Sequence, residues 1–371
     1  VQGDLTLQFV GDPSFTIAKL QQLIEKTRQA GVQNINGNVI IDGTAFAKPW
    51  YGPGWSQDDL NWYFAAPISA MILNENCFGI NLQPNATLQQ PASLTFAVGP
   101  LQKYLTLQHA VTTVTFESAK DLCALNADVN DMNHVSLDGC WPSGSAEKLK
   151  FAVKNPERLM QQVVNDLLQA EGIQVSGQVI VGKKPKEWQV IAEQKSAPLQ
   201  DLIRTVLKDS NNVYAECITK TLGAKLYNVG SFLTGSMAIK TILHKHTDIN
   251  FNQSVLVDGS GLSRYDLLTP RQIVRLLFVM SNEPKFSSLY QQALPESGED
   301  GSLKNRMQSI DLRGHIHAKT GSFKGVASLS GYLTSVHNKP LIFSVMINHV
   351  VDDSKDAQLL QSQILQVLYQ L

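Results

Sequence analysis

The sequence predicts an α/β (α+β) protein in which an antiparallel sheet is flanked by helices and two smaller domains are nested ahead of it. Three observations predict this architecture: a helix–glycine–strand unit that occurs twice, alternating apolar runs between its two copies, and a carboxyl-terminal region in which helices precede strand-like runs. The chain has 371 residues, of which 43% are hydrophobic and 17% are charged. At roughly 100–200 residues per domain, this length provides two or three domains, each able to bury its own core.

The repeated unit predicts a small α/β domain. Each copy begins with apolar positions on one helical face, which are Leu20, Leu23, Ile24 and Thr27 in the first copy and Leu159, Val163, Val164, Leu167 and Leu168 in the second. Gly31 and Gly172 end the two helices, and the runs 37–41 and 177–181 then have the pattern of strands. Two matching units indicate one domain whose halves are separated by an insertion.

The stretch between the two copies predicts a mostly β insertion. It carries alternating apolar runs at 93–98 and 111–116, which are typical of strands. The predicted domains are a small α/β domain of residues 1–50 and 149–192, the β insertion of residues 51–148, and an α/β domain of residues 193–371.

The carboxyl-terminal region predicts helices followed by an antiparallel sheet. Amphipathic or helical patterns cover 199–208 and 270–280. A further helix is predicted after Asn212, with one row of residues along it: Tyr214, Ile218, Leu222 and Leu226. Strand-like runs follow at 315–319, 326–334 and 340–349. The chain ends on an amphipathic helix containing Leu360, Ile364, Val367 and Leu368. Its polar face is rich in Gln rather than Lys, so we expect it to pack on the sheet and not on a membrane.

Charge and composition exclude several classes of protein. Lys and Arg (31) nearly balance Asp and Glu (32), so the chain lacks the basic surface that nucleic-acid binding requires. No apolar run reaches the ~18 residues of a membrane span. The four cysteines form no CxxC pair, which argues against zinc.

Cys123 and Cys140 form a disulfide if the compartment is oxidising; buried free thiols are the alternative, which we favour for Cys217.

Two short motifs carry the functional prediction, since no phosphate-binding loop, G-x-S-x-G or H-E-x-x-H motif is present. Ser210-Asn211-Asn212 is an S-x-N triplet between two predicted helices, where a helix cap is the ordinary alternative. Lys319-Thr320-Gly321-Ser322 is a K-T-G-S run on a predicted strand, where a surface lysine before a bend is the alternative. In this order and setting, the two match the second and third motifs of penicillin-recognising acyl transferases.

On these motifs the sequence resembles the D-alanyl-D-alanine carboxypeptidase/endopeptidase family, the class C low-molecular-mass penicillin-binding proteins. Further similarity lies in the runs Gly3–Leu5, Gly11–Pro13, Pro53–Trp55, Ser196–Leu199, Asp258–Arg264 and Asp300–Leu303. The resemblance implies a β-lactamase-like catalytic domain with inserted domains, a periplasmic location, and peptidoglycan stem peptides and β-lactams as ligands. It implies no organic cofactor and no catalytic metal, and oligomeric state is left open.

The resemblance also implies the chemistry. A serine attacks the penultimate D-Ala carbonyl, and an acyl-enzyme forms and is hydrolysed. Ser210 relays a proton toward the leaving amine, Asn212 orients the substrate amide, and Lys319 supplies positive charge that tunes the proton network.

The remaining residues of the K-T-G-S run are expected to bind substrate. Thr320 and Ser322 hold the terminal carboxylate, the Ser322 N–H contributes to the oxyanion hole, and Gly321 lets the substrate approach the strand edge. Asp59 and Arg264 match positions that in the family bind the amino and carboxylate groups of diaminopimelate; a surface acid and a structural arginine are the alternative.

The family's nucleophile motif, S-x-x-K, is expected ahead of Val1 on an apolar helix. The one match within the chain, Ser145–Lys148, follows Pro142-Ser143-Gly144 and has the pattern of a loop entering a strand, so we do not assign it as the nucleophile. Whether the nucleophile precedes Val1 or the natural protein lacks it stays open. A non-catalytic muropeptide-binding module on the same fold and a β-lactamase-like hydrolase are the alternative functions.

Overall fold

The computed structural model describes residues 1–121, 123–251, 254–309, 311–351 and 355–371. The chain divides into two compact units. The first comprises residues 1–51, 55–196 and 229–231, and the second comprises residues 52–54, 197–228 and 232–371. Among the described residues, no helix combines the length and the apolar character that crossing a membrane requires.

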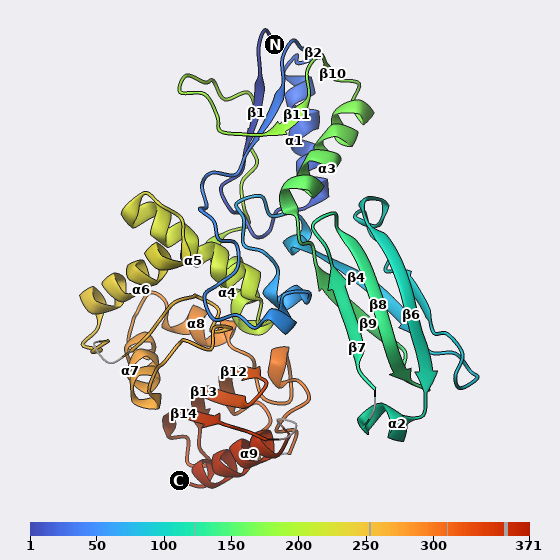
Figure 1. Ribbon diagram of the computed structural model, residues 1–371. Helices are drawn as coiled ribbons and strands as arrows, with labels where there is room; N and C mark the ends of the chain where they lie inside the picture. The colour runs from blue at the N-terminus through green and yellow to red at the C-terminus, as the bar shows by residue number, and fades with distance from the viewer. Residues whose placement is uncertain (122, 252–253, 310, 352–354) are drawn as a thin grey trace. The chain divides into compact units, whose positions relative to one another are not determined.

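A small parallel sheet brings the two copies of the repeated unit together in the first unit. It has the order β1-β3-β11 and consists of β1 (Leu5–Gln8), β3 (Val39–Asp42) and β11 (Val179–Val181). A second parallel pair joins β2 (Asn34–Ile35) to β10 (Gln174–Val175). The predicted helices are α1 (Ile17–Gln29) and α3 (Pro156–Ala170), beside this sheet (Figure 1). Both glycines that follow them have a positive φ, +95° at Gly31 and +69° at Gly172, which an L side chain rarely adopts.

The rest of the first unit is mostly β. One sheet has the order β5-β4-β9, from β4 (Cys77–Gln83), β5 (Ser93–Phe96) and β9 (Glu147–Ala152). The other has the order β6-β8-β7, from β6 (Thr106–Val114), β7 (Leu125–Val129) and β8 (His134–Pro142). The strand predicted up to Phe116 was wrong at its end, because Phe116 begins α2 (Phe116–Asp121). Thr115 Oγ1 accepts the Ser118 N–H at 3.2 Å there, which favours a helix start.

The four cysteines take both of the states that the sequence allowed, a disulfide and thiols. Cys123 and Cys140 form a disulfide, whereas Cys77 and Cys217 lie outside it as thiols, the second of them buried. Burial raises the pKa of the Cys77 thiol well above its usual range.

The second unit contains the predicted antiparallel sheet and its helices. The sheet has the order β12-β13-β14, from β12 (Ile316–Phe323), β13 (Val326–Thr334) and β14 (Pro340–Asn348). Its helices are α4 (Leu199–Lys208), α5 (Asn212–Tyr227), α6 (Phe232–His246), α7 (Pro270–Ser281), α8 (Ser287–Ala293) and α9 (Lys355–Tyr369). The predictions missed α6, whose buried positions include Gly235, Ser236 and Ala238 and form no apolar stripe.

The closing helix packs on the sheet as expected, but through a different face. The buried row of α9 is Ala357, Gln361, Leu365 and Tyr369, and Leu365 and Tyr369 share a core with sheet residues of β12, β13 and β14. Figure 1 shows α9 beside this sheet. Leu360 and Val367, which we predicted to pack, are exposed. A glutamine can replace them inside because Arg306 Nη2 donates to Gln361 Oε1 at 2.9 Å, which satisfies its buried oxygen.

The predicted row of α5 was also wrong. Tyr214, Ile218 and Leu222 are half-buried and Leu226 is exposed. The buried face instead carries Glu216, Cys217 and Lys220 together with Gly223. A side chain at Gly223 would lie 2.7 Å from the Gly235 backbone N, so the glycine is required for α5 and α6 to approach each other closely.

Candidate active site

The K-T-G-S run lies within β12, at one edge of the three-stranded sheet. Its inner edge pairs with β13, in a register that joins Lys319 to Ser330 and Ser322 to Ala327. On its outer edge the strand is covered near its beginning, where the Ala318 N–H donates to Pro295 O at 3.0 Å. Within the described ranges, no backbone–backbone hydrogen bond continues this outer pairing past Ala318. The outer edge of the run is therefore available to pair with an extended peptide.

The two predicted motifs meet through a lysine–serine contact. Lys319 Nζ donates to Ser210 Oγ at 2.7 Å, across 109 residues of sequence, and to Thr320 O at 2.8 Å. Burial lowers the pKa of the Lys319 ammonium to about 8, because desolvation disfavours the charged form. A cation with a pKa near neutrality, bonded to an exposed hydroxyl, can supply both charge and a proton path.

In the S-x-N motif between α4 and α5, one residue caps the helix and another supplies the hydroxyl that contacts Lys319. Asn211 is the cap of α5, since its Oδ1 accepts the Tyr214 N–H at 3.2 Å. Ser210 precedes it with a φ of +55°, a left-handed conformation that is uncommon for a residue other than glycine. Asn212 is the first residue of the helix and is half-buried. The capping role that the sequence left open thus belongs to the middle residue, and Ser210 Oγ is left to bind Lys319.

A short turn joins the end of α4 to the K-T-G-S strand. Thr320 Oγ1 donates to Ser302 Oγ at 2.7 Å, and Ser302 lies in the 3-10 turn η5 (Gly301–Leu303). The residue before this turn, Asp300, accepts a hydrogen bond from Lys208 Nζ, at the last residue of α4. This ion pair and hydrogen bond tie the segment leading to Ser210 to the strand that carries Thr320.

Comparison with known proteins matches this arrangement to a family. Over residues 1–371 the chain matches the D-Ala-D-Ala carboxypeptidase 3 (S13) family. The chain belongs to this family. It is 31% identical over 357 residues to the D-alanyl-D-alanine carboxypeptidase DacB of Haemophilus influenzae, covering 94% of this chain and 72% of the relative. It is 28% identical to a D-alanyl-D-alanine carboxypeptidase of an Actinomadura species, covering 93% of this chain and 65% of that relative.

Solved structures agree with this S13 assignment. Penicillin binding protein 4 (dacB) from Haemophilus influenzae matches with a TM-score of 0.86 and 30% identity, over 99% of this chain and 82% of that one. A structure of that protein complexed with a β-lactam matches with a TM-score of 0.81 and 29% identity, over all of this chain and 82% of that one. The penicillin-recognising serine peptidase fold predicted from the two motifs is therefore confirmed.

The structure gives a second reason for glycine at position 321, besides the approach of substrate that the motif suggested. It is the register partner of Ser328 on β13, and a side chain at Gly321 would lie 2.5 Å from Ser328 Oγ. The S13 chain thus needs glycine there for the contact between its own strands, in addition to any approach of substrate. Ser322, next along the strand, is exposed.

Arg264 lies beside the end of the K-T-G-S strand. Its Nη1 donates to Lys324 O at 3.1 Å, and its guanidinium carbon lies 4.8 Å from the centre of the Phe323 ring. The side chain is exposed and sits beside the turn that follows Ser322. Asp59 lies in the 3-10 turn η1 (Gln57–Asp59) of the first unit and is half-buried.

The S-x-x-K match inside the chain does not have the geometry of a catalytic motif. Ser145 is exposed in the connection between β8 and β9, and its carbonyl accepts the Trp141 Nε1–H at 2.6 Å. Lys148 lies in β9, so the two residues do not share a helical turn. This agrees with our expectation of a loop that enters a strand.

Sequence reasoning missed Ser302 as a candidate site residue. The run Asp300–Leu303 was noted only for its resemblance to the family, and no pattern in it indicates a contact with Thr320. Gly301, which has a φ of +54°, is the local signal: a side chain there would lie 2.8 Å from Lys208 O. A glycine that a close backbone approach requires marks a place where two distant segments meet.

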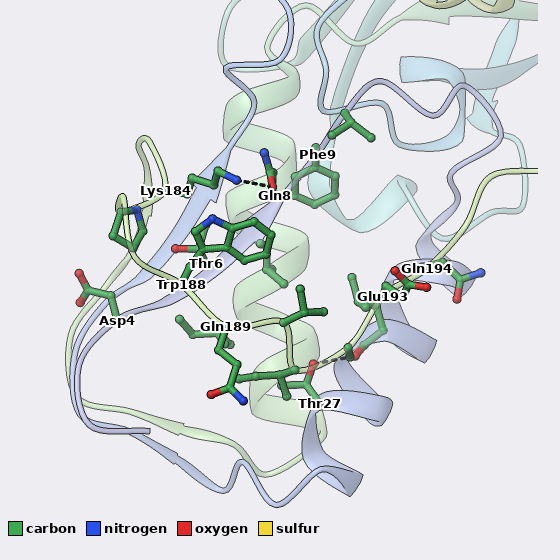
Figure 2. Close-up of a pocket in the computed structure, with 18 of the residues that line it drawn as sticks. Asp4, Thr6, Gln8, Phe9, Thr27, Lys184, Trp188, Gln189, Glu193 and Gln194 are labelled. Carbon is green, nitrogen blue, oxygen red and sulfur yellow. Dashed lines mark hydrogen bonds between the residues drawn. The ribbon is translucent and has the colours of Figure 1, made fainter. Parts of the chain in front are cut away.

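A cavity of about 560 Å³ in the first unit contains none of the predicted site residues. Figure 2 shows it between β1 and the segment 184–194, with Trp188 and Lys184 among its lining residues. Lys184 Nζ donates to Gln8 Oε1 at 3.3 Å and lies 3.9 Å from the centre of the Trp188 ring. The Lys184 side chain in the cavity wall is thus already bound to two other lining residues.

Proposed function

We propose that this protein is a serine-type D-Ala-D-Ala carboxypeptidase and DD-endopeptidase that cleaves peptidoglycan stem peptides through an acyl-enzyme and is inhibited by penicillin. The observation that carries the proposal is the 2.7 Å hydrogen bond from Lys319 Nζ to Ser210 Oγ beside an uncovered strand edge. Membership of the S13 family supports the reaction class. The second unit then supplies the proton relay and the substrate-binding edge, while the nucleophilic serine is not assigned within this chain.

The lysine–serine contact accounts for proton transfer to the leaving group. The attacking serine hydroxyl forms an ester with the penultimate D-Ala carbonyl, and the peptide C–N bond breaks. The departing D-Ala nitrogen needs one proton, and Ser210 can donate its own hydroxyl hydrogen because its oxygen already accepts a bond from Lys319. The proton removed from the nucleophile returns to Ser210 through the hydrogen-bond network, so acylation consumes and releases no net proton. Water then hydrolyses the ester and releases the shortened peptide.

The K-T-G-S strand would hold the substrate's carboxyl-terminal end. A terminal carboxylate can accept hydrogen bonds from the Thr320 and Ser322 hydroxyls. Thr320 has one hydroxyl hydrogen, which it gives to Ser302 in the structure, so on binding that hydrogen would turn to the carboxylate and the Ser302 hydroxyl would donate to Thr320 Oγ1. The Ser322 backbone N–H, with that of the nucleophile, would stabilise the oxyanion of the tetrahedral intermediate. Asn212 would orient the substrate amide from the start of α5.

Asp59 and Arg264 would select the stem-peptide side chain. Diaminopimelate carries an amino and a carboxylate group, and one acid and one guanidinium complement those charges. A protein that acts on this substrate class would work in the periplasm, where peptidoglycan lies. The Cys123–Cys140 disulfide fits such an oxidising compartment.

The experiment that tests the proposal measures D-Ala release from a diaminopimelate-containing pentapeptide by the full-length protein, with and without benzylpenicillin. We expect release that penicillin abolishes, together with a covalent adduct that peptide mapping places on a serine followed three residues later by lysine on a helix. A folded full-length protein that releases no D-Ala would contradict the proposal.

A non-catalytic module on the same fold is the alternative function. The chain contains a single S-x-x-K, and its serine lies in an exposed loop rather than on a helix. Without another nucleophile, the same strand edge would bind stem peptides or penicillin reversibly, as a non-catalytic module. Peptide mapping after incubation with penicillin distinguishes the two functions, because this module would bind penicillin without any covalent adduct.

A further inference from the structure

The buried face of α5 carries ionisable side chains where an amphipathic helix carries leucines. Glu216 and Lys220 are both 0% exposed, whereas Leu226 on the same helix is exposed. Taking a charged group out of water is costly unless specific partners replace the water. The contacts of Glu216 therefore indicate what this face of the helix does.

Glu216 binds the backbone of a segment that is distant in sequence. Its carboxylate accepts the Gly259 N–H at 3.0 Å on both oxygens and the Ser260 N–H at 2.9 Å on Oε1. Gly259 packs directly on α5, since a side chain there would overlap Thr219 Oγ1. The carboxylate thus fixes the position of this backbone on the helix that begins with the S-x-N motif.

The same segment is folded tightly up to Arg264. Asp258 accepts the Gly261 and Ser263 N–H groups, each at 2.8 Å. Ser263 Oγ donates to Pro53 O at 2.6 Å, and the Arg264 N–H donates to Gly54 O at 3.3 Å. These hydrogen bonds fix the backbone between Gly259, which Glu216 binds, and Arg264, whose guanidinium lies beside Phe323.

Burial and the backbone hydrogen bonds act on the Glu216 carboxyl in opposite directions. Burial and the neighbouring Asp258 raise the pKa of Glu216 to about 8, while hydrogen bonds from Gly259 and Ser260 favour its charged form. Burial lowers the pKa of Lys220, one helical turn further on, to about 8. An amide at position 216 would keep the size, but it has one acceptor oxygen in place of two, and its NH₂ group would face a backbone donor.

We propose that Glu216 is a positioning residue that fixes segment 258–264 on α5 and thereby sets Arg264 beside the end of the K-T-G-S strand. The inference deepens the proposed function and rests on it, because it gives Arg264 the task of binding a carboxylate on the substrate's side chain. Glu216 itself touches no substrate. It acts through the backbone of Gly259 and Ser260.

The test compares Glu216→Gln, Arg264→Gln and the double variant in the full-length enzyme. The substrates are two pentapeptides that differ only at the third residue, diaminopimelate in one and lysine in the other. We expect Glu216→Gln to lower kcat/KM about tenfold for the diaminopimelate peptide, the scale of one hydrogen bond to a charged group. The lysine peptide and acylation by benzylpenicillin should change less than about twofold. The double variant should be no slower than Arg264→Gln alone.

Two further variants keep the comparison interpretable. Asp248→Asn removes an exposed ion pair with Arg275 in the same unit and should leave every rate unchanged. Glu216→Asp keeps the charge and replaces Glu216→Gln in the cycle if the amide variant does not fold. Equal losses on both peptides, or losses that add in the double variant, would overturn the positioning role. Absence of D-Ala release by the parent enzyme would instead overturn the proposed function.

Discussion

Replacement of Lys319 by methionine should slow acylation without unfolding the second unit. Methionine keeps an unbranched side chain of similar length but removes the ammonium that donates to Ser210 Oγ at 2.7 Å and to Thr320 O at 2.8 Å. The group is half-buried, and its pKa of about 8 shows that its surroundings disfavour the charge. Removing it therefore relieves a desolvation cost while the hydrogen bond to the proton relay is lost.

The size of the effect follows from one hydrogen bond. A hydrogen bond made by a charged donor contributes about 1.5–3 kcal/mol, and at ~1.4 kcal/mol per factor of ten this corresponds to roughly a 10–150-fold lower kcat/KM. The bond to Thr320 O lies within the strand and is expected to affect stability more than rate. Loss of the proton path itself would add to the decrease.

The pH dependence has a defined sign. Lys319 donates in its protonated form, so activity should be present below its pKa and decline as pH rises through about 8. Lys319→Arg should move that decline to higher pH, because a guanidinium stays protonated up to pH ~12.

The assay is D-Ala release by the full-length protein between pH 6 and 10 (a range of about four units around the Lys319 pKa), with circular dichroism melts to confirm folding. Acylation by a fluorescent penicillin gives a second rate on the same samples. If Lys319→Met retained parental kcat/KM, or if Lys319→Arg left the alkaline decline in place, the assignment of Lys319 to the proton network would be refuted.

Three further predictions concern substrate binding and stability. Ser302→Ala removes the acceptor of the Thr320 hydroxyl and should raise KM about two- to tenfold for peptides with a free terminal carboxylate, with kcat nearly unchanged, as steady-state kinetics would reveal. Asp59→Ala and Arg264→Ala should each weaken turnover of diaminopimelate-containing muropeptides more than acylation by penicillin; equal effects on both reactions would contradict the assignment. Leu329→Ala, at a 0% exposed core position of β13, should lower the free energy of unfolding by about 2–5 kcal/mol in denaturant titrations, and a change below about 1 kcal/mol would show that this core is loosely packed.

The elements that the sequence predicted well are those with a regular apolar period. The row Leu20, Ile24 and Thr27 is buried in α1, and Leu159, Val163 and Leu168 are buried in α3, as their spacing predicts. Such faces follow from local geometry, because residues three and four apart lie on one side of a helix. The K-T-G-S strand was also predicted, although β12 extends to Phe323, beyond the end we expected.

The predictions failed where polar or small residues form the buried face. In α9 the buried row contains Gln361, and in α5 it contains Glu216 and Lys220, so an apolar pattern selects the wrong positions. Each of these side chains is buried with partners that come from elsewhere in the fold. A periodicity argument has no access to those partners.

The sequence by itself determined the family and the order of the S-x-N and K-T-G-S motifs. Only the tertiary structure decided that Asn211 is the helix cap while Ser210 binds Lys319, that Ser302 contacts Thr320, and that Glu216 binds the backbone of segment 258–264. The physical reason is distance along the chain. Periodicity, caps and turns arise between near neighbours, whereas these hydrogen bonds join groups that become neighbours only when the sheet and helices of the second unit have packed.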